Sequence, residues 1–168
     1  LIVHDATTGK RVLSVTGLRE FPGGLTWDPT GRHIVTLSSD RKMELIDTRK
    51  GQKLKLIASV ELPALDFGGH VIEPRLYKLF HDDQLFSFKR APAFSPCGQL
   101  LVAPCGHLES GDRNIYGNFV FQRSRLFTKN RPSWILPSPK ATLLVRMCPV
   151  LLELDSCSEE NYSGLPYR

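Results

Sequence analysis

The stretch from residue 23 to residue 47 constrains the fold most, because it has the pattern strand, turn, strand, turn and strand in close succession. Residues 28–31, Asp-Pro-Thr-Gly, have turn chemistry, since proline fixes φ at the second position and glycine accepts a positive φ at the end. Residues 33–37 are a short run rich in β-branched side chains, and residues 43–47 alternate in character. Such an antiparallel unit is typical of an all-β protein.

The same unit recurs along the chain. Asp5 and Asp47 each close an apolar run and precede a glycine turn, and they lie 42 positions apart. A repeat of about 40–45 residues is the period of WD-type propeller blades. The turn around Pro29 returns around Pro96, 67 positions later, so about 25 residues are inserted between these two copies.

These repeats predict an all-β fold, a fragment of a WD-repeat β-propeller. A four-stranded blade has two apolar faces and buries them only by stacking on other blades around an axis, in rings of about four to eight. At one blade per repeat the chain holds about three to four. It begins with Leu1 inside an expected third strand, so we expect a fragment of a longer protein. An antiparallel sandwich is the alternative, which the aligned turns disfavour.

We divide the chain into one continuous series of blades. The expected parts are the end of a blade (1–16), a blade with its outer strand at 53–62 (17–62), an inserted loop (63–87), a blade (88–139) and the start of the next blade (140–168). Within the second complete blade we expect strands at 88–94, 99–103, 119–122 and 133–136, and a lengthened middle turn from 105 to 117. A further strand is expected at 140–145. A long loop inside a repeat is more often functional than structural.

Composition excludes several classes of protein. No apolar run approaches the roughly 18 residues of a membrane span, and no phosphate loop, nucleophile elbow or dinucleotide motif is present. We therefore expect no membrane association, no cofactor and no enzymatic activity. The four cysteines have no metal-type spacing and are interpreted as free thiols of a reducing compartment. A net charge of +5 is compatible with acidic partners but does not by itself indicate DNA binding.

Two clusters could carry chemistry, and for both we favour the simpler interpretation. His81, Asp82 and Asp83 are adjacent, so on a strand their side chains point to opposite faces and do not converge on a metal. An ordered or partner-facing loop is favoured. Cys105 and His107 supply only two ligands, too few for zinc. The basic side chains of Arg123, Arg125, Lys129 and Arg131 could meet phosphates or an acidic protein segment, but a solvated blade edge is favoured.

Several stretches carry a resemblance to one family. They are 24–29, 77–83, 94–101, 108–111, 118–121, 140–150 and 165–168. In collinear order they resemble the middle-sized WD-repeat subunit of chromatin assembly factor 1. The resemblance implies a seven-bladed propeller in a nuclear, three-subunit histone chaperone that deposits core histones during DNA replication and repair. The implied partners are the large subunit and core histones, with other histone chaperones bound through regions absent here, and no sequence-specific nucleic-acid binding.

The resemblance leaves two alternatives open, a HIRA-type histone regulator acting independently of replication and a generic WD-repeat adaptor. The chain also departs from the usual WD repeat, because Trp-Asp is replaced by His4-Asp5 and Ile46-Asp47 and no His follows Gly17. We expect structural turn roles for Gly31, Asp40, Asp47 and Gly98. We expect partner contacts at Lys78, Phe80, His81, Asp82, Asp83, Arg123 and Arg125.

Overall fold

The chain is built almost entirely of short antiparallel strands. The computed structural model describes residues 1–67 and 71–150. The strands are β1 (Ile2–His4), β2 (Arg11–Ser14), β3 (Pro22–Trp27), β4 (His33–Ser38), β5 (Met43–Asp47), β6 (Lys53–Ile57), β7 (Ser59–Leu62), β8 (Leu65–Asp66), β9 (Val71–Ile72), β10 (Arg75–Lys78), β11 (Ala93–Phe94), β12 (Leu100–Ser110), β13 (Arg113–Gln122) and β14 (Trp134–Ser138). One short helix, α1 (Arg123–Leu126), follows β13. None of the described helices is long and apolar enough to cross a membrane.

The first complete sheet has the order β3-β4-β5-β6, which is the order expected for the blade at 17–62. The outer strand is shorter than predicted, however. The expected strand at 53–62 breaks at Ala58, whose carbonyl oxygen accepts a hydrogen bond from the Leu79 amide at 2.9 Å. Beyond this break β7 leaves the sheet and pairs antiparallel with β10, so Val60 lies opposite Tyr77. The expected loop at 63–87 therefore includes the strands β8, β9 and β10.

The second sheet has the order β11-β12-β13-β14 and differs from the sequence prediction in two places. The strand expected at 88–94 is limited to β11. The lengthened turn expected at 105–117 is instead a long hairpin, in which β12 and β13 pair out to Ser110 opposite Arg113. Gly106 lies opposite Gly117 in this ladder. The two glycines, which look like turn residues in the sequence, permit close approach of neighbouring strands, since an added Cβ on Gly106 would lie 2.5 Å from the Gly117 oxygen.

The repeated turns have matching hydrogen bonds. The side-chain Oδ1 of Asp5 accepts from the amides of Thr7 and Thr8, and Oδ1 of Asp47 accepts from the amides two and three residues further on. The turn at 28–31 closes with the Gly31 amide on the Asp28 oxygen at 2.7 Å, and the turn at 95–98 closes in the same way at 2.8 Å. Gly31 and Gly98 both have a positive φ, 74° and 69°.

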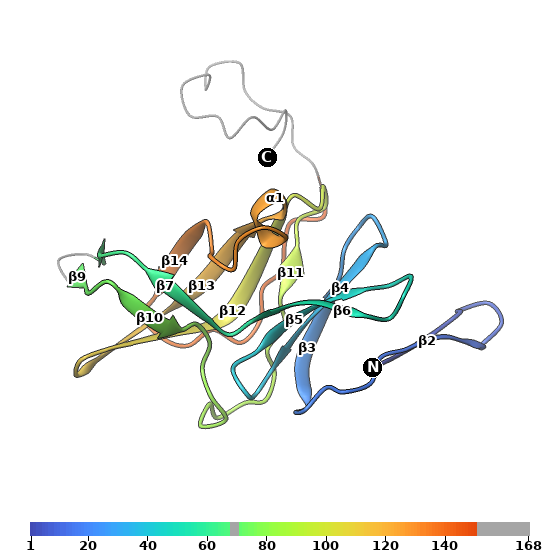
Figure 1. Cartoon of the computed structure of the whole chain (residues 1–168), viewed down its shortest axis with the longest axis horizontal. Coiled ribbons are helices and arrows are strands. Elements are labelled where there is room, and N and C mark those ends of the chain that lie inside the picture. Colours follow the sequence, from blue (N-terminus) through green and yellow to red (C-terminus); the bar gives the residue numbers. More distant parts are fainter. Residues whose placement is uncertain (68–70, 151–168) are drawn as a thin grey trace, which may run out of the picture.

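The innermost segments of consecutive sheets lie side by side, as in a propeller (Figure 1). The Arg90 amide donates to the Gly23 oxygen at 3.0 Å, which joins the segment leading to β11 to β3. On its other side Ala91 bonds to Leu143 and Val145, so 143–145 runs parallel to it. The strand expected at 140–145 is thus reduced to a single bridge at Leu144, and the part of the expected range 140–168 beyond residue 150 lies outside the described residues.

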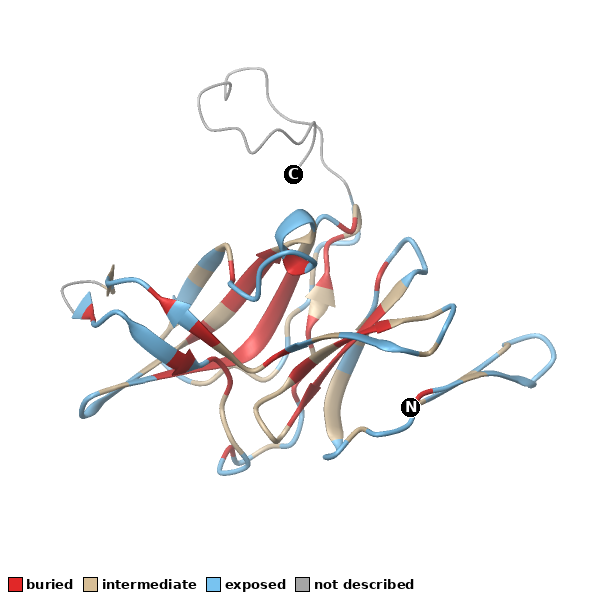
Figure 2. Ribbon diagram, in the orientation of Figure 1, coloured by how far each residue is buried: buried red, intermediate tan, exposed pale blue. Residues whose placement is uncertain are grey.

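The core lies where the two sheets and the β7–β10 pair face one another (Figure 2). It contains Leu37 and Leu45 of the first sheet, Phe119 and Phe121 of the second, and Leu79 between them. A smaller cluster of Val15, Ile34 and Ile46 packs under the β1–β2 hairpin. Each complete sheet thus has apolar side chains on both faces, which is the pattern of stacked blades.

Candidate partner-binding surfaces

Phe80, expected at a partner surface, belongs to the core. Its side chain is fully buried, and its ring lies edge-to-face on Phe119 with centroids 5.7 Å apart. The prediction was wrong because Phe80 is held inside by the second sheet, where it forms an isolated bridge with Gly106. Its backbone oxygen also accepts a 2.6 Å hydrogen bond from Nε of Arg41.

The three residues that follow Phe80 leave the core for the surface. The His81 ring stacks on His107 with centroids 4.6 Å apart, and His107 stacks on Tyr116 at 5.1 Å. Nδ1 of His81 lies 3.0 Å from Oδ1 of Asp82. Asp83 is exposed. The stack fixes where the loop leaves the sheet, so Asp82 and Asp83 are presented from a rigid base.

A buried arginine, which the sequence analysis missed, holds this loop in place. Arg90 is almost fully buried, and its guanidinium donates to the backbone oxygens of His81, at 2.6 Å, and Asp82. Burial lowers the pKa of Arg90, although Cys105, Asp82 and Asp83 favour the charged form. In the sequence, a basic residue in a loop is expected to be exposed to solvent. The signal that could have indicated burial of Arg90 is the glycine pair at 23 and 24, which lets β3 approach this segment closely.

Arg123 is committed to an internal cluster instead of being free for a partner. Its Nη2 lies 2.8 Å from Oδ2 of Asp28, which also accepts from Thr30 at 2.6 Å and lies 3.2 Å from Nδ1 of His33. Burial alone would raise the pKa of Asp28, but the bonds from Arg123, Thr30 and His33 outweigh it and hold the pKa well below the usual range. This Asp28 cluster ties the first sheet to α1. Its members are Asp28, Thr30, His33 and Arg123.

Two further expected contact residues are exposed. Lys78 ends β10, and Arg125 lies in α1. Lys78 lines a small cavity with Arg41 and Glu109, whose side chains pair at 2.9 Å. The expected surface is therefore divided, since Lys78 and Asp83 are available on one part of the molecule and Arg125 on another.

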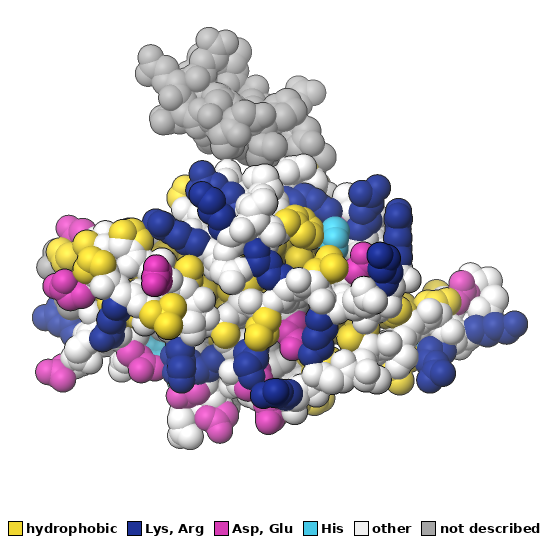
Figure 3. Space-filling model, viewed as in Figure 1, with side chains coloured by type: hydrophobic (Ala, Val, Ile, Leu, Met, Phe, Trp, Pro, Cys, Tyr) yellow, Lys and Arg dark blue, Asp and Glu magenta, His cyan; other side chains and the backbone are white. Residues whose placement is uncertain are grey.

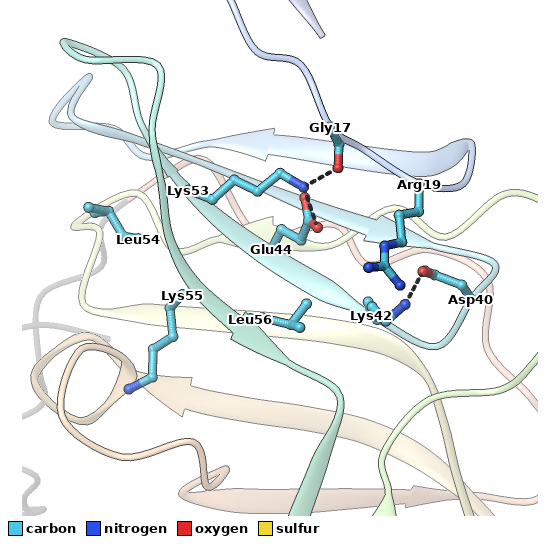
Figure 4. Close-up of a pocket in the computed structure, with 9 residues that line it drawn as sticks. All are labelled: Gly17, Arg19, Asp40, Lys42, Glu44, Lys53, Leu54, Lys55 and Leu56. Atoms are coloured by element: carbon cyan, nitrogen blue, oxygen red, sulfur yellow. Dashed lines mark hydrogen bonds and ion pairs between the residues drawn. The ribbon is translucent and has the colours of Figure 1, made fainter.

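A shallow groove of about 510 Å³ lies over β5 and β6 and contains Asp40, which was expected to have only a turn role (Figure 4). Oδ2 of Asp40 pairs with Nζ of Lys42 at 2.5 Å. Across the groove Nζ of Lys53 bonds to Glu44 at 2.8 Å and to the Gly17 oxygen at 2.6 Å. Both carboxylates that line the groove, Asp40 and Glu44, are thus paired with lysines, and Arg19 and Lys55 line it as well.

Within the described part of the chain, no three His, Cys, Asp or Glu side chains gather closely enough to hold a metal ion. Cys105 and His107, considered above as possible zinc ligands, each have a hydrogen-bond partner within the protein. Sγ of Cys105 lies 3.0 Å from the Thr142 oxygen, and Nε2 of His107 lies 3.0 Å from Oδ1 of Asn114. The pKa of His107 is lowered, chiefly by burial.

Cys105 should be far less reactive than the exposed Cys148. Burial raises the pKa of the Cys105 thiol to about 11, which nearby Arg90 only partly offsets. Because the thiolate is the nucleophile, iodoacetamide at pH 8 should modify Cys148 and leave Cys105 intact in the native protein. Mass spectrometry of the peptides measures this, with the denatured protein as control. Equal modification of both native thiols would contradict the packing described.

The model of the CAF1B/HIR1 beta-propeller domain matches residues 1–168. The chain belongs to the CAF1B/HIR1 beta-propeller family. The all-β architecture, with inner segments side by side, agrees with the family's fold.

Individual relatives of this CAF1B/HIR1 beta-propeller chain point the same way. The B subunit of chromatin assembly factor 1 from Mus musculus is 38% identical over 178 residues, which cover 100% of this chain and 30% of that protein. The protein of the same name from Gallus gallus is 39% identical over 99% of this chain and 30% of its own length. The chromatin assembly factor 1 subunit FAS2 homolog of Oryza sativa subsp. japonica is 32% identical over 99% of this chain and 34% of its own length. The chain thus spans about a third of the length of these relatives.

Sequence reasoning also missed an aromatic patch on this CAF1B/HIR1 beta-propeller chain. Phe86 and Phe88 in the loop after Asp83 are 86% and 76% exposed, and Phe21 is 71% exposed. The rings of Phe21 and Phe88 lie edge-to-face with centroids 6.5 Å apart. Phe21 lies 67 positions before Phe88 in the sequence, and the pairing of Arg90 with Gly23 brings their two segments together.

Proposed function

We propose that the chain is part of a non-enzymatic scaffold subunit of a histone chaperone that assembles nucleosomes. In this proposal the parent protein works in the nucleus, binds the large subunit of a chromatin assembly factor 1 complex, and helps to deposit core histones during replication and repair. The main support for this proposal is the match of the whole chain to the B subunits of chromatin assembly factor 1, in animals and in yeast. Contacts with other histone chaperones would involve regions outside this chain.

The geometry supports a scaffold role through the rigidity of its exposed loops. Asp83 and the aromatic patch of Phe21, Phe86 and Phe88 protrude from a base fixed by Arg90 and the stacked His81 ring. A rigid exposed aromatic patch binds a partner at low entropic cost, and clustered aromatics dominate many interfaces. Lys78 and Asp83 would then provide the polar rim.

A second candidate function has one observation in its favour. The matching family model includes HIR1-type propellers as well as CAF1B-type ones. A HIRA-type regulator deposits histones without ongoing replication, so the two candidates differ in the DNA they act on and not in fold.

A nucleosome assembly assay distinguishes these candidates. The full-length parent protein would be added to an extract depleted of its endogenous counterpart, and supercoiling would be measured on a replicating and a non-replicating plasmid. We expect rescue on the replicating plasmid alone. Equal rescue on both would favour the HIRA-type role, and no rescue on either would reject the histone-assembly proposal in favour of another adaptor role.

Exchange of Lys78 and Asp83 for Ala in the full-length protein should weaken capture of the large subunit several-fold without changing the melting temperature. Capture should weaken because the two exposed charges would lie in the polar rim of the interface. The melting temperature should not change because neither side chain packs in the core. The matched control exchanges Lys10 and Glu20, which are exposed elsewhere on the chain. Unchanged capture would show that Lys78 and Asp83 lie outside the interface.

A further inference from the structure

A second groove separates the strands β7 and β8 from the start of β14. It has a volume of about 270 Å³, and its lining includes Leu62, Leu65, Phe67, Arg131, Trp134 and Ile135. Leu62 is buried, and Leu65, Phe67 and Ile135 are partly buried against the main core. The floor is therefore apolar and well supported.

One basic residue, Arg131, lines this groove at the end of a basic segment. The segment 123–131 carries four basic residues and no acidic one. Arg123 is used internally by the Asp28 cluster. Within residues 1–67 and 71–150, no ion pair or side-chain hydrogen bond involves Arg125, Lys129 or Arg131, and all three are exposed. Figure 3 shows Lys and Arg side chains along the upper part of the molecule, around the position of α1.

The basic segment is held in a fixed position. The Ser133 amide donates to the Val120 oxygen at 2.7 Å, and the Gln122 amide donates to the Ser133 hydroxyl at 3.3 Å. Leu126 is buried and anchors α1. Arg131 thus lies at the groove on a segment whose backbone is held at both ends, by Leu126 and Ser133.

The charge distribution along the groove indicates the class of ligand. Asp66 lines the same groove as Arg131 and already has an interaction within the protein. A nucleic acid carries a charge at every step and would bring phosphates close to Asp66. A peptide can place an acidic side chain at Arg131 and aliphatic side chains over Leu65 and Phe67.

We propose that this groove binds an extended protein segment in which acidic residues alternate with aliphatic ones. The apolar floor buries the aliphatic side chains, and Arg131, with Arg125 and Lys129 nearby in sequence, pairs with the carboxylates. The volume suits one or two side chains, below the range of most small-molecule sites. This inference does not depend on the histone-assembly proposal, because it rests on the groove alone.

Binding of a defined probe to the full-length protein tests the inference. The probe is a fluorescein-labelled peptide with a core of alternating Glu and Leu between Gly-Ser flanks, followed by fluorescence anisotropy. Two control peptides replace each Glu by Lys or each Leu by Ser. We expect saturable binding of the first peptide only, and about tenfold weaker binding to an Arg131→Glu variant.

The matched control variant is Arg11→Glu, which reverses an exposed charge on β2, away from the groove. It should bind the probe as the unmodified protein does. Equal weakening by both variants, binding of the Ser-substituted peptide, or displacement of the probe by an oligonucleotide of equal charge would overturn the inference. Melting curves of both variants confirm that they fold.

Discussion

Replacing Gly24 by Ala should destabilise the protein by about 3 kcal/mol or more, or prevent folding. An added Cβ would lie 2.3 Å from the Arg90 oxygen and 2.6 Å from the Ala91 Cα. Both are backbone atoms, so no side chain can rotate away to make room. The inner segments of the two sheets would have to separate, which would break the hydrogen bond between Arg90 and Gly23. Thermal unfolding of the full-length variant measures the loss.

Gly31→Ala is the matched control for this prediction. Gly31 has a φ of +74°, but nothing lies within 4 Å of an added Cβ. Its substitution should therefore cost only the backbone strain, about 1 kcal/mol. If both variants melt at the same temperature, the close approach of β3 to the segment before β11 is contradicted.

Asp28→Ala should cost about 3 kcal/mol of folding stability, because it leaves Arg123, Thr30 and His33 without their shared acceptor. The contribution should also depend on pH. The folded-state pKa of Asp28 lies below the unfolded value of about 4, so the stabilisation is present above that pH and is lost as the pH falls below it. Urea unfolding from pH 7 down to about pH 2 follows this loss.

Asp5→Ala serves as the control for Asp28. Asp5 makes a similar turn but is exposed to solvent around its carboxylate, and it has no arginine partner in the described part of the chain. Its substitution should have a much smaller effect than that of Asp28. An Asp28→Ala variant that is as stable as the unmodified protein, with an unchanged pH profile, would exclude a structural role for the Asp28 cluster.

Local chemistry made part of this fold predictable. The turns at 28–31 and 47–51, and the strands that flank them, follow from proline, glycine and alternating apolar residues within a few positions. The same local reasoning failed for the hairpin of β12 and β13, because Gly106 and Gly117 act through a contact across the ladder.

The candidate site was harder to predict because its residues act over long distances in the sequence. Arg123 bonds to Asp28, 95 positions away, so a side chain that looks like a free surface charge is a structural one. Phe80 looked like a loop residue next to a polar cluster, yet its ring is in the core. Phe21 and Phe88 meet only because β3 and the segment before β11 are neighbours.

The most direct test of the account is affinity capture of the full-length parent protein from replicating nuclei, followed by immunoblotting for the large chromatin assembly subunit and core histones. The account predicts that both are recovered together. Recovery of histones with a HIRA-type complex instead would move the protein to the second candidate function. Recovery of neither histones nor any chromatin assembly subunit would contradict the proposed function and leave only the propeller fold.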